Sequence, residues 1–178
     1  MKLKIKVKRI NKSIELPKII DKGDWIDLRS SKDIVMSAPQ ASVLKRHKVD
    51  GVDTPHRDVK FDSKLIGLGV AMRLPKGFEA VVLPRSSSFK HWGIIQTNSM
   101  GVIDNSYSSN EDEWKLPVIA TRDEVIKEGE RVCQFRVQLS QKATFWQKLR
   151  WFFCNGVKLV EVQDLGDSKR GGFGSTGK

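Results

Sequence analysis

Two segments in the middle of the chain combine charged, hydroxyl and aromatic residue types that could form a phosphate-binding or catalytic site. In Leu83-Pro-Arg85-Ser-Ser-Ser88, a guanidinium, hydroxyls and backbone N–H groups follow a predicted strand, a combination that suits a polyphosphate. The segment from Gly93 to Tyr107 predicts a strand, a tight turn and a second strand, followed by Asp104 and an aromatic ring three residues on.

The C-terminal stretch Gly172-Phe-Gly-Ser-Thr-Gly177-Lys178 matches seven positions of the phosphate loop of nucleotide hydrolases. That loop must lead from a strand into a helix and carry a Ser or Thr after the lysine. Neither condition is met, so we do not interpret the stretch as such a loop. Its glycines and hydroxyls could still close around phosphate oxygens, with Arg170 pairing with a terminal phosphate.

Each of these residues also has a structural interpretation. Asp104 could cap an Asx turn after a strand, and Asn98-Ser-Met-Gly101 could be a simple turn. Tyr107 could be a core or edge tyrosine, and a glycine-rich terminus could be no more than a solvated tail. From the residues alone, these alternatives stay open.

The elements that would position these residues are mostly short strands separated by turn residues. We expect strands at residues 3–10, 24–29, 33–36, 65–74, 79–84, 93–97, 116–120, 131–139 and 157–162. Many short strands without alternating helices favour an all-β sandwich, jelly roll or barrel. Residues 40–64 predict a long polar insert, and residues 140–156 place Phe145, Leu149 and Phe152 at helical spacing, which predicts a short helix.

The whole chain of 178 residues fits one β domain over 1–166, followed by a glycine-rich arm over 167–178. The net charge is +11, but residues 101–135 carry −4, whereas residues 1–22 carry +6 and residues 142–158 carry +4. The last segment adds five aromatic residues, which leaves contact with nucleic acid or a protein as an alternative to packing. Apolar runs are too short to span a membrane, and the two cysteines in apolar surroundings indicate a reducing cytoplasm.

Five segments in order resemble the motifs of the trimeric dUTP diphosphatases (dUTPases), in the form found in bacilli and their phages. They are Asp24-Trp-Ile-Asp27-Leu28, Pro84-Arg-Ser-Ser87, Gly101-Val-Ile-Asp-Asn-Ser-Tyr107, Gly129-Glu-Arg-Val-Cys-Gln134 and Arg170-Gly-Gly-Phe-Gly-Ser-Thr-Gly177. The sequence departs from the family pattern in three places. Ala-Gly is missing before the first motif, Cys133 stands where Ala is common, and the fifth motif is two residues shorter.

The resemblance implies a distorted jelly roll that forms a homotrimer and hydrolyses dUTP to dUMP and pyrophosphate with Mg²⁺. It implies that Asp104 is the general base and that Tyr107 lies on the deoxyribose. Uracil would be read by Asn98 and by the backbone of the hairpin that includes Gly101 and Ile103. Removal of dUTP from the nucleotide pool and supply of dUMP would follow.

For the phosphates, the resemblance implies Arg85, Ser86, Ser87, Gln134 and Arg170, with Arg131 as a structural ion-pair partner. Asp27 and Gln134 would contact the metal through water. The arm would close over the nucleotide with Phe173, Gly174, Ser175 and Thr176, Phe173 stacking on uracil. Trp114 is a second candidate for that lid, although we favour core packing for it.

Two other functions remain open. A dCTP deaminase of the same fold also has an Arg-Ser-Ser segment, but Asp104, Tyr107 and the arm favour the diphosphatase. A non-catalytic regulatory or nucleic-acid-binding trimer would use the basic aromatic insert. We expect dUTP as ligand, no membrane contact, no nucleic acid, and a protein partner only through the inserts.

Overall fold

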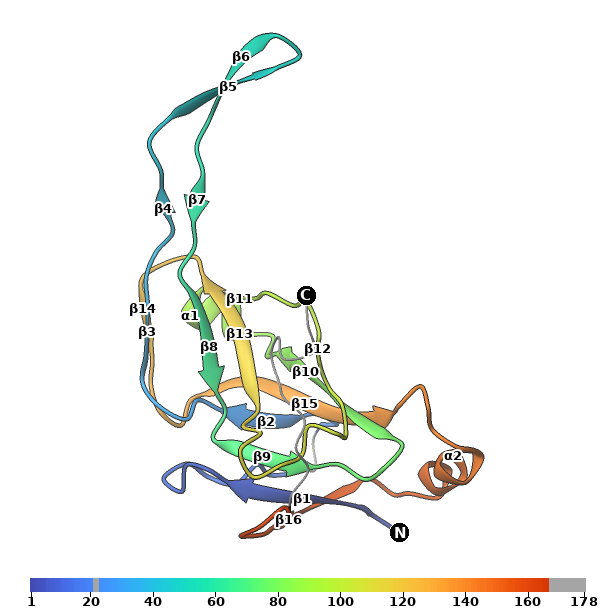
Figure 1. The fold of residues 1–178 in the computed structure, drawn as a ribbon. Coiled ribbons are helices and arrows are strands. Elements are labelled where there is room, and N and C mark those ends of the chain that lie inside the picture. The colour runs from blue at the N-terminus through green and yellow to red at the C-terminus, as the bar shows by residue number, and fades with distance from the viewer. Residues whose placement is uncertain (21–22, 167–178) are drawn as a thin grey trace.

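The computed structural model describes residues 1–20 and 23–166. Its main sheet has four strands in the order β12 (Gly101–Ile103), β10 (Phe78–Pro84), β15 (Arg131–Leu139) and β2 (Ile26–Arg29), and all of its pairs are antiparallel. Each strand of this sheet carries at least one of the predicted site residues or ends next to one. The sheet is therefore the frame on which the candidate site is built (Figure 1).

Two three-stranded sheets surround this frame. One has the order β16 (Val157–Glu161), β1 (Leu3–Arg9), β9 (Val70–Arg73), and the other β11 (Ile94–Gln96), β13 (Lys115–Ala120), β8 (Ser63–Gly67). β14 (Glu124–Ile126) pairs with β3 (Ile34–Met36). The parallel pairing of β1 with β16 brings the two ends of the described chain side by side. The architecture is the all-β distorted jelly roll expected from the sequence.

The core lies between these sheets and is filled by large apolar side chains. Trp114 and Phe135 are fully buried, and their rings meet edge to face with centroids 5.2 Å apart. Period-two burial, as in Leu3, Ile5 and Val7 of β1, explains how basic residues alternate with core residues along the strand. The alternation at the N-terminus is confirmed as a half-buried strand.

The expected strand over 65–74 is wrong in one respect, because the chain bends between β8 and β9. Gly69 has φ +66°, and its N–H donates to Glu113 Oε1 at 2.9 Å. Its carbonyl oxygen accepts from the N–H of Ile10. An added Cβ at Gly69 would come 2.4 Å from Ile14 Cδ1. A glycine is therefore required at this corner.

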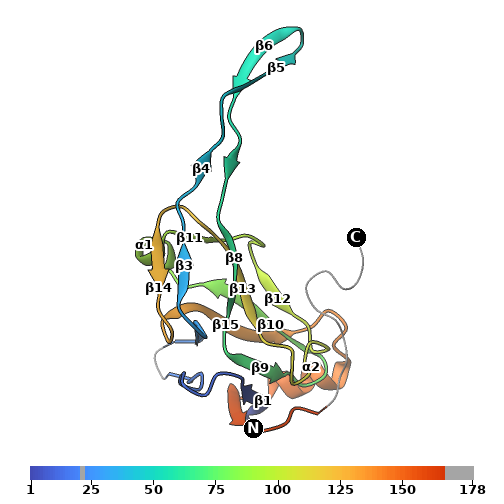
Figure 2. The same ribbon diagram turned by 60° about the vertical axis from the view of Figure 1, so that its left-hand side comes forward.

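The polar insert forms a ribbon that projects far from the body in both views (Figures 1 and 2). It consists of β4 (Gln40–Ala41) with β7 (Val59–Lys60) and of β5 (Lys45–Val49) with β6 (Val52–His56). Asp50 and Gly51 connect β5 to β6 with φ values of +53° and +81°, as a two-residue hairpin requires. The ribbon falls within residues 40–64, where the sequence predicts a polar insert, and its strands were not predicted.

Two short helices complete the fold. α1 (Ser88–Trp92) follows β10 directly and ends at Gly93, whose φ is +61°. α2 (Phe145–Phe152) lies in the insert predicted to be helical, and a capping box between Thr144 and Gln147 fixes its start. Among the described residues, no helix is long and apolar enough to span a membrane.

Candidate active site

A carboxylate and two arginines meet where β2, β10 and β15 run side by side. Asp27 Oδ1 pairs with Arg85 Nε at 2.9 Å, and Asp27 Oδ2 pairs with Arg131 Nη1 at 3.1 Å. The three come from three of the five motifs in the sequence. The expected ion pairing of Arg131 is confirmed, and the same carboxylate also orients Arg85.

Gln134 lies in the same row of the sheet. It is the register partner of Asp27 on one side and of Leu83 on the other, and its Nε2 donates to the carbonyl oxygen of Pro84 at 3.3 Å. Side chains of directly opposed residues in an antiparallel pair point to the same face. Asp27 and Gln134 therefore share one face of the sheet, and Asp27 holds Arg85 and Arg131 by ion pairs. We call these four residues the arginine cluster.

The turn at Arg85–Ser88, after β10, is anchored to β15 by the Ser88 side chain. Its buried hydroxyl donates to the carbonyl oxygen of Val132 at 2.8 Å and accepts from the N–H of Arg85 at 3.0 Å. This anchoring leaves Ser86 exposed and Ser87 half-buried at the surface of the turn. Ser88 was not among the predicted site residues, and its role is to shape the turn that presents the others.

Asp104 begins a tight turn directly after β12. Its Oδ1 accepts from the N–H of Ser106 at 2.7 Å, and its carbonyl oxygen accepts from the N–H of Tyr107 at 3.0 Å. The side chain of Asp104 is exposed. The structure thus contains the Asx turn, and this geometry also presents a carboxylate to solvent at a fixed place.

Tyr107 is held at the other end of that turn. Its hydroxyl donates to the carbonyl oxygen of Glu113 at 3.0 Å, and its half-buried ring packs against the core. Burial raises the pKa of the phenol, and the nearby carboxylates of Asp112 and Glu113 raise it further. The phenol consequently keeps its proton. The hydrogen bond to Glu113 holds the ring of this residue, which follows Asp104 by three positions.

The turn between β11 and β12 carries Asn98 and leads into Gly101. Asn98 Oδ1 accepts from Gln96 Nε2 at 2.6 Å, and the same nitrogen donates to the carbonyl oxygen of Val82 at 3.3 Å. A Cβ on Gly101 would come 3.4 Å from Gln96 Nε2 and from Val82. The sequence interpretation missed Gln96, although a polar residue at an inward strand position beside Ile94 is a detectable signal.

The predicted residues fall into two groups at opposite corners of the main sheet. Ile103 pairs with Ala80, so Asp104 follows near Glu79, whereas Arg85 follows Pro84 at the other end of β10. At about 3.4 Å per residue, Glu79 and Pro84 lie about 17 Å apart along the strand. In addition, β12 and β2 form opposite edges of the sheet, and Arg85 turns toward β2. One chain therefore keeps Asp104 apart from the arginine cluster.

Two predictions about the lid have different outcomes. Trp114 is fully buried against Phe135, so it cannot close over a ligand, and the preferred interpretation of core packing is confirmed. Arg170, Phe173, Gly174, Ser175 and Thr176 lie outside the described residues.

Cys133 lies directly beneath the arginine cluster. It is fully buried, and this burial raises the pKa of its thiol far above the ordinary value, with Asp27 adding to the shift. Cys154, the second cysteine that the sequence places in apolar surroundings, is only half-buried. A neutral thiol at position 133 fills space under the sheet and adds no charge to the site.

The described residues include no group of three or more His, Cys, Asp or Glu side chains that could hold a metal ion. The oxygens near the cluster come from Asp27, whose carboxylate is already paired with two arginines, and from Gln134. Mg²⁺ commonly keeps several waters and binds substrate phosphates as well as protein. This donor set fits contact through water better than direct coordination.

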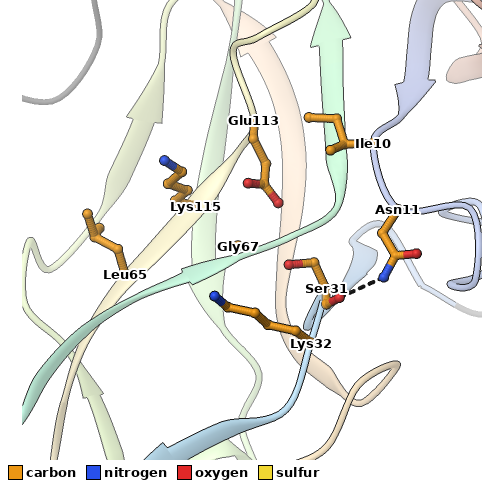
Figure 3. Close-up of a pocket in the computed structure, with 8 residues that line it drawn as sticks. All are labelled: Ile10, Asn11, Ser31, Lys32, Leu65, Gly67, Glu113 and Lys115. Carbon is orange, nitrogen blue, oxygen red and sulfur yellow. Dashed lines mark hydrogen bonds between the residues drawn. The ribbon is translucent and has the colours of Figure 1, made fainter.

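A separate hollow of about 350 Å³ lies on another part of the surface (Figure 3). Its lining includes Lys32, Leu65, Glu113 and Lys115, and Asn11 Nδ2 donates across it to the carbonyl oxygen of Ser31 at 2.7 Å. None of the predicted site residues within the described ranges lines it. Glu113, which does line it, accepts the hydrogen bond from the Tyr107 hydroxyl through its carbonyl oxygen.

Comparison with known proteins identifies the family. Residues 58–149 match the dUTPase family model. The chain is 41% identical to the SPbeta prophage-derived deoxyuridine 5'-triphosphate nucleotidohydrolase of Bacillus subtilis, over 98% of this chain and 99% of that protein. It is 30% identical to the deoxyuridine 5'-triphosphate nucleotidohydrolase of Nautilia profundicola, over 99% of this chain and the whole of that protein.

Solved structures support the same fold. The dUTPase of Streptococcus mutans has a TM-score of 0.58 at 21% identity and covers 78% of this chain and 98% of its own. A mutant dUTPase from phage phi11 of S. aureus, which reveals how a structural Mg(II) ion is coordinated, has a TM-score of 0.58 at 12% identity, covering 79% of this chain and 94% of its own. With four of the five motifs lying on the described part of this jelly roll and a close relative matched over nearly its full length, the chain belongs to the dUTPase family of dUTP-hydrolysing enzymes.

Proposed function

We propose that the protein hydrolyses dUTP to dUMP and pyrophosphate, with Asp104 as the general base for attack of water on the α-phosphorus. The observation that carries this proposal is the turn that fixes the exposed carboxylate of Asp104 and leads into Tyr107, whose hydroxyl is held by Glu113. Ser106 and Tyr107 both donate backbone hydrogen bonds to Asp104. A general base held in this way typically contributes a rate factor of about 10²–10⁴.

Tyr107 would select the sugar. Its ring is fixed from behind by the hydrogen bond to Glu113, so it cannot retreat from a ribose that carries a 2′-hydroxyl. A deoxyribose lies flat on the ring without this clash. The expected result is a preference for deoxynucleotides that depends on the ring and not on the phenol hydroxyl.

The arginine cluster would bind the phosphates. Arg85 is oriented by Asp27, and a guanidinium is well suited to paired phosphate oxygens. Ser86 and the backbone N–H of Ser87 would contact the α- and β-phosphates from the exposed side of the same turn. Holding the chain of phosphates straight aligns the leaving group with the attacking water. In the arm, Arg170, Gly174, Ser175 and Thr176 would close over the phosphates while Phe173 stacks on uracil.

Mg²⁺ would be held by the triphosphate, with Asp27 and Gln134 contacting its waters. These two residues are direct register partners and share one face of the sheet. When bound, the ion neutralises charge that develops on the leaving pyrophosphate. The protein's own part is to fix the position of the waters through these two side chains.

The complete site requires more than one chain. Asp104 and the arginine cluster lie at opposite corners of the main sheet, whereas the base and the phosphate ligands must contact one nucleotide. A symmetric oligomer solves this by placing Asp104 of one copy against Arg85 of the next. This supports the homotrimer that the family resemblance implies.

The placement of the protein in a reducing compartment is supported by its two cysteines, neither of which forms a disulfide. We infer a cytoplasmic enzyme that acts on the nucleotide pool.

The test is steady-state hydrolysis of dUTP, dTTP, dCTP and UTP, with pyrophosphate and ammonia both measured. We expect pyrophosphate from dUTP and little product from the other three nucleotides. Ammonia from dCTP would instead identify a dCTP deaminase. Absence of any turnover by a folded oligomer would favour the non-catalytic alternative.

A further inference from the structure

We propose that Gln96 is a specificity-determining positioning residue, which acts through Asn98 to make the site accept uracil and reject cytosine. The inference rests on the proposed hydrolysis of dUTP. It is carried by a separate observation, the hydrogen bonds of a buried amide behind the turn between β11 and β12.

Gln96 occupies an inward-facing position of β11, where the alternation of a strand normally places an apolar residue. In β11, Ile94 and Gln96 face inward and Ile95 faces outward, and Gln96 is only 7% exposed. An amide at such a position costs desolvation free energy unless its hydrogen bonds are satisfied. Within residues 1–20 and 23–166, Oε1 of Gln96 has no hydrogen-bond partner. Packing alone therefore does not explain why a glutamine is present.

The nitrogen of this amide is fully engaged. Nε2 donates to the carbonyl oxygen of Val82 at 3.3 Å and to Asn98 Oδ1 at 2.6 Å. The bond to Val82 fixes the Gln96 side chain against the central strand β10. The bond to Asn98 then holds the Asn98 side chain in the turn at a fixed place relative to that strand. Gly101 lies against this pair, since a Cβ there would come into van der Waals contact, at 3.4 Å, with Gln96 Nε2 and with Val82.

The consequence for Asn98 is a defined direction of its amide. Since Oδ1 accepts from Gln96, the Nδ2 group is the end that remains to face a ligand. Uracil presents a carbonyl oxygen at position 4, which accepts from this N–H group, whereas cytosine presents an amino group, which also donates. Two donors that face each other form no hydrogen bond, and leaving a donor without an acceptor is unfavourable.

Two substitutions separate this role from simple packing. Gln96→Met keeps the length and removes the donor, and Gln96→Glu keeps the shape but places an acceptor opposite Asn98 Oδ1. We expect the ratio of kcat/KM for dUTP over dCTP to fall by about tenfold in the Met variant, mainly through the KM for dUTP. The Glu variant should lose more, because its carboxylate attracts the Nδ2 group and turns Oδ1 toward the base.

Three controls make the result specific. Gln147→Met removes another hydrogen-bonded glutamine, on α2, and should leave the ratio unchanged. Calorimetric binding of dUMP and dCMP should show the same loss of preference without any turnover. In an Asn98→Ala background, Gln96→Met should have no further effect, since the two act as one unit.

An unchanged dUTP to dCTP ratio in Gln96→Met would overturn the inference, as would a full additional effect in the Asn98→Ala background. A wild-type protein that binds dUMP more tightly than dCMP but does not hydrolyse dUTP would contradict the proposed function. The role of Gln96 would then be decided by calorimetry alone, from the dUMP and dCMP affinities of Gln96→Met.

Discussion

At the scale of single residues, the hydrogen bonds of the turn at Asp104 allow the carboxylate to be removed without loss of the turn. An asparagine at this position keeps an oxygen that can accept from the N–H of Ser106, so the turn should persist. We expect Asp104→Asn to lower kcat for dUTP by about 10²–10⁴-fold with little change in nucleotide affinity. Asp164→Asn, in a similar turn with Gly166, is the matched control and should keep full activity.

The two cysteines should differ sharply toward thiol reagents. Burial raises the pKa of Cys133, and the thiolate is the reactive form. In native protein at mildly alkaline pH, maleimide should label Cys154 and leave Cys133 unmodified, as read by peptide mass spectrometry. Raising the pH should not label Cys133 before unfolding occurs. Labelling of Cys133 in the folded state would contradict the packing described under the arginine cluster.

At the scale of elements, Gly69 is the corner where one predicted strand becomes β8 and β9. Gly69→Ala should lower the free energy of unfolding by about 2 kcal/mol or more, from the positive φ and from the contact with Ile14. Gly129→Ala is the matched control, because Gly129 also has a positive φ but open space around it. It should cost about 1 kcal/mol. If chemical denaturation gave the same loss of unfolding free energy for Gly69→Ala and Gly129→Ala, contact with Ile14 would not constrain the corner.

α2 carries an exposed apolar stripe on the side away from the body. Phe145, Trp146 and Phe152 are 69%, 73% and 80% exposed, whereas Trp151 packs edge to face on Phe78. Replacing the three exposed aromatics with serine should reduce binding of an apolar dye and leave kcat for dUTP unchanged, because none of them touches a site residue in the described structure. Lost turnover with the fold retained would place the helix in the active site.

The sequence allowed most elements to be predicted where burial alternates with period two, as in β1 and β15. The bend at Gly69 and the strands of the projecting ribbon could not be predicted in this way. The bend depends on a contact with distant Glu113. The ribbon has almost no buried residue, so its strands leave no hydrophobic pattern, and the only local signal was the Asp50-Gly51 turn.

At the scale of the whole molecule, the motifs name candidate site residues but do not reveal how one chain divides them. The pairing of Asp27 with both Arg85 and Arg131 depends on strands β2, β10 and β15 becoming neighbours, which spacing along the sequence does not reveal. Gln96 escaped prediction for a related reason, since its partners Val82 and Asn98 come from two different elements. The separation of Asp104 from the arginine cluster became visible only through strand register.

The most direct test of a site shared between copies is complementation of two inactive variants. Asp104→Asn and Arg85→Ala should each be inactive, because each damages every site in its own oligomer. When differently tagged copies are unfolded together, refolded in equal amounts and purified as mixed oligomers, sites that combine the intact Asp104 of one copy with the intact Arg85 of another should form. In a cyclic trimer that contains both variants, one of the three shared sites combines the two intact residues, so we predict recovery of about a third of the wild-type rate of dUTP hydrolysis. Mixed oligomers as inactive as their parents, beside an active wild type refolded in the same way, would contradict the shared site.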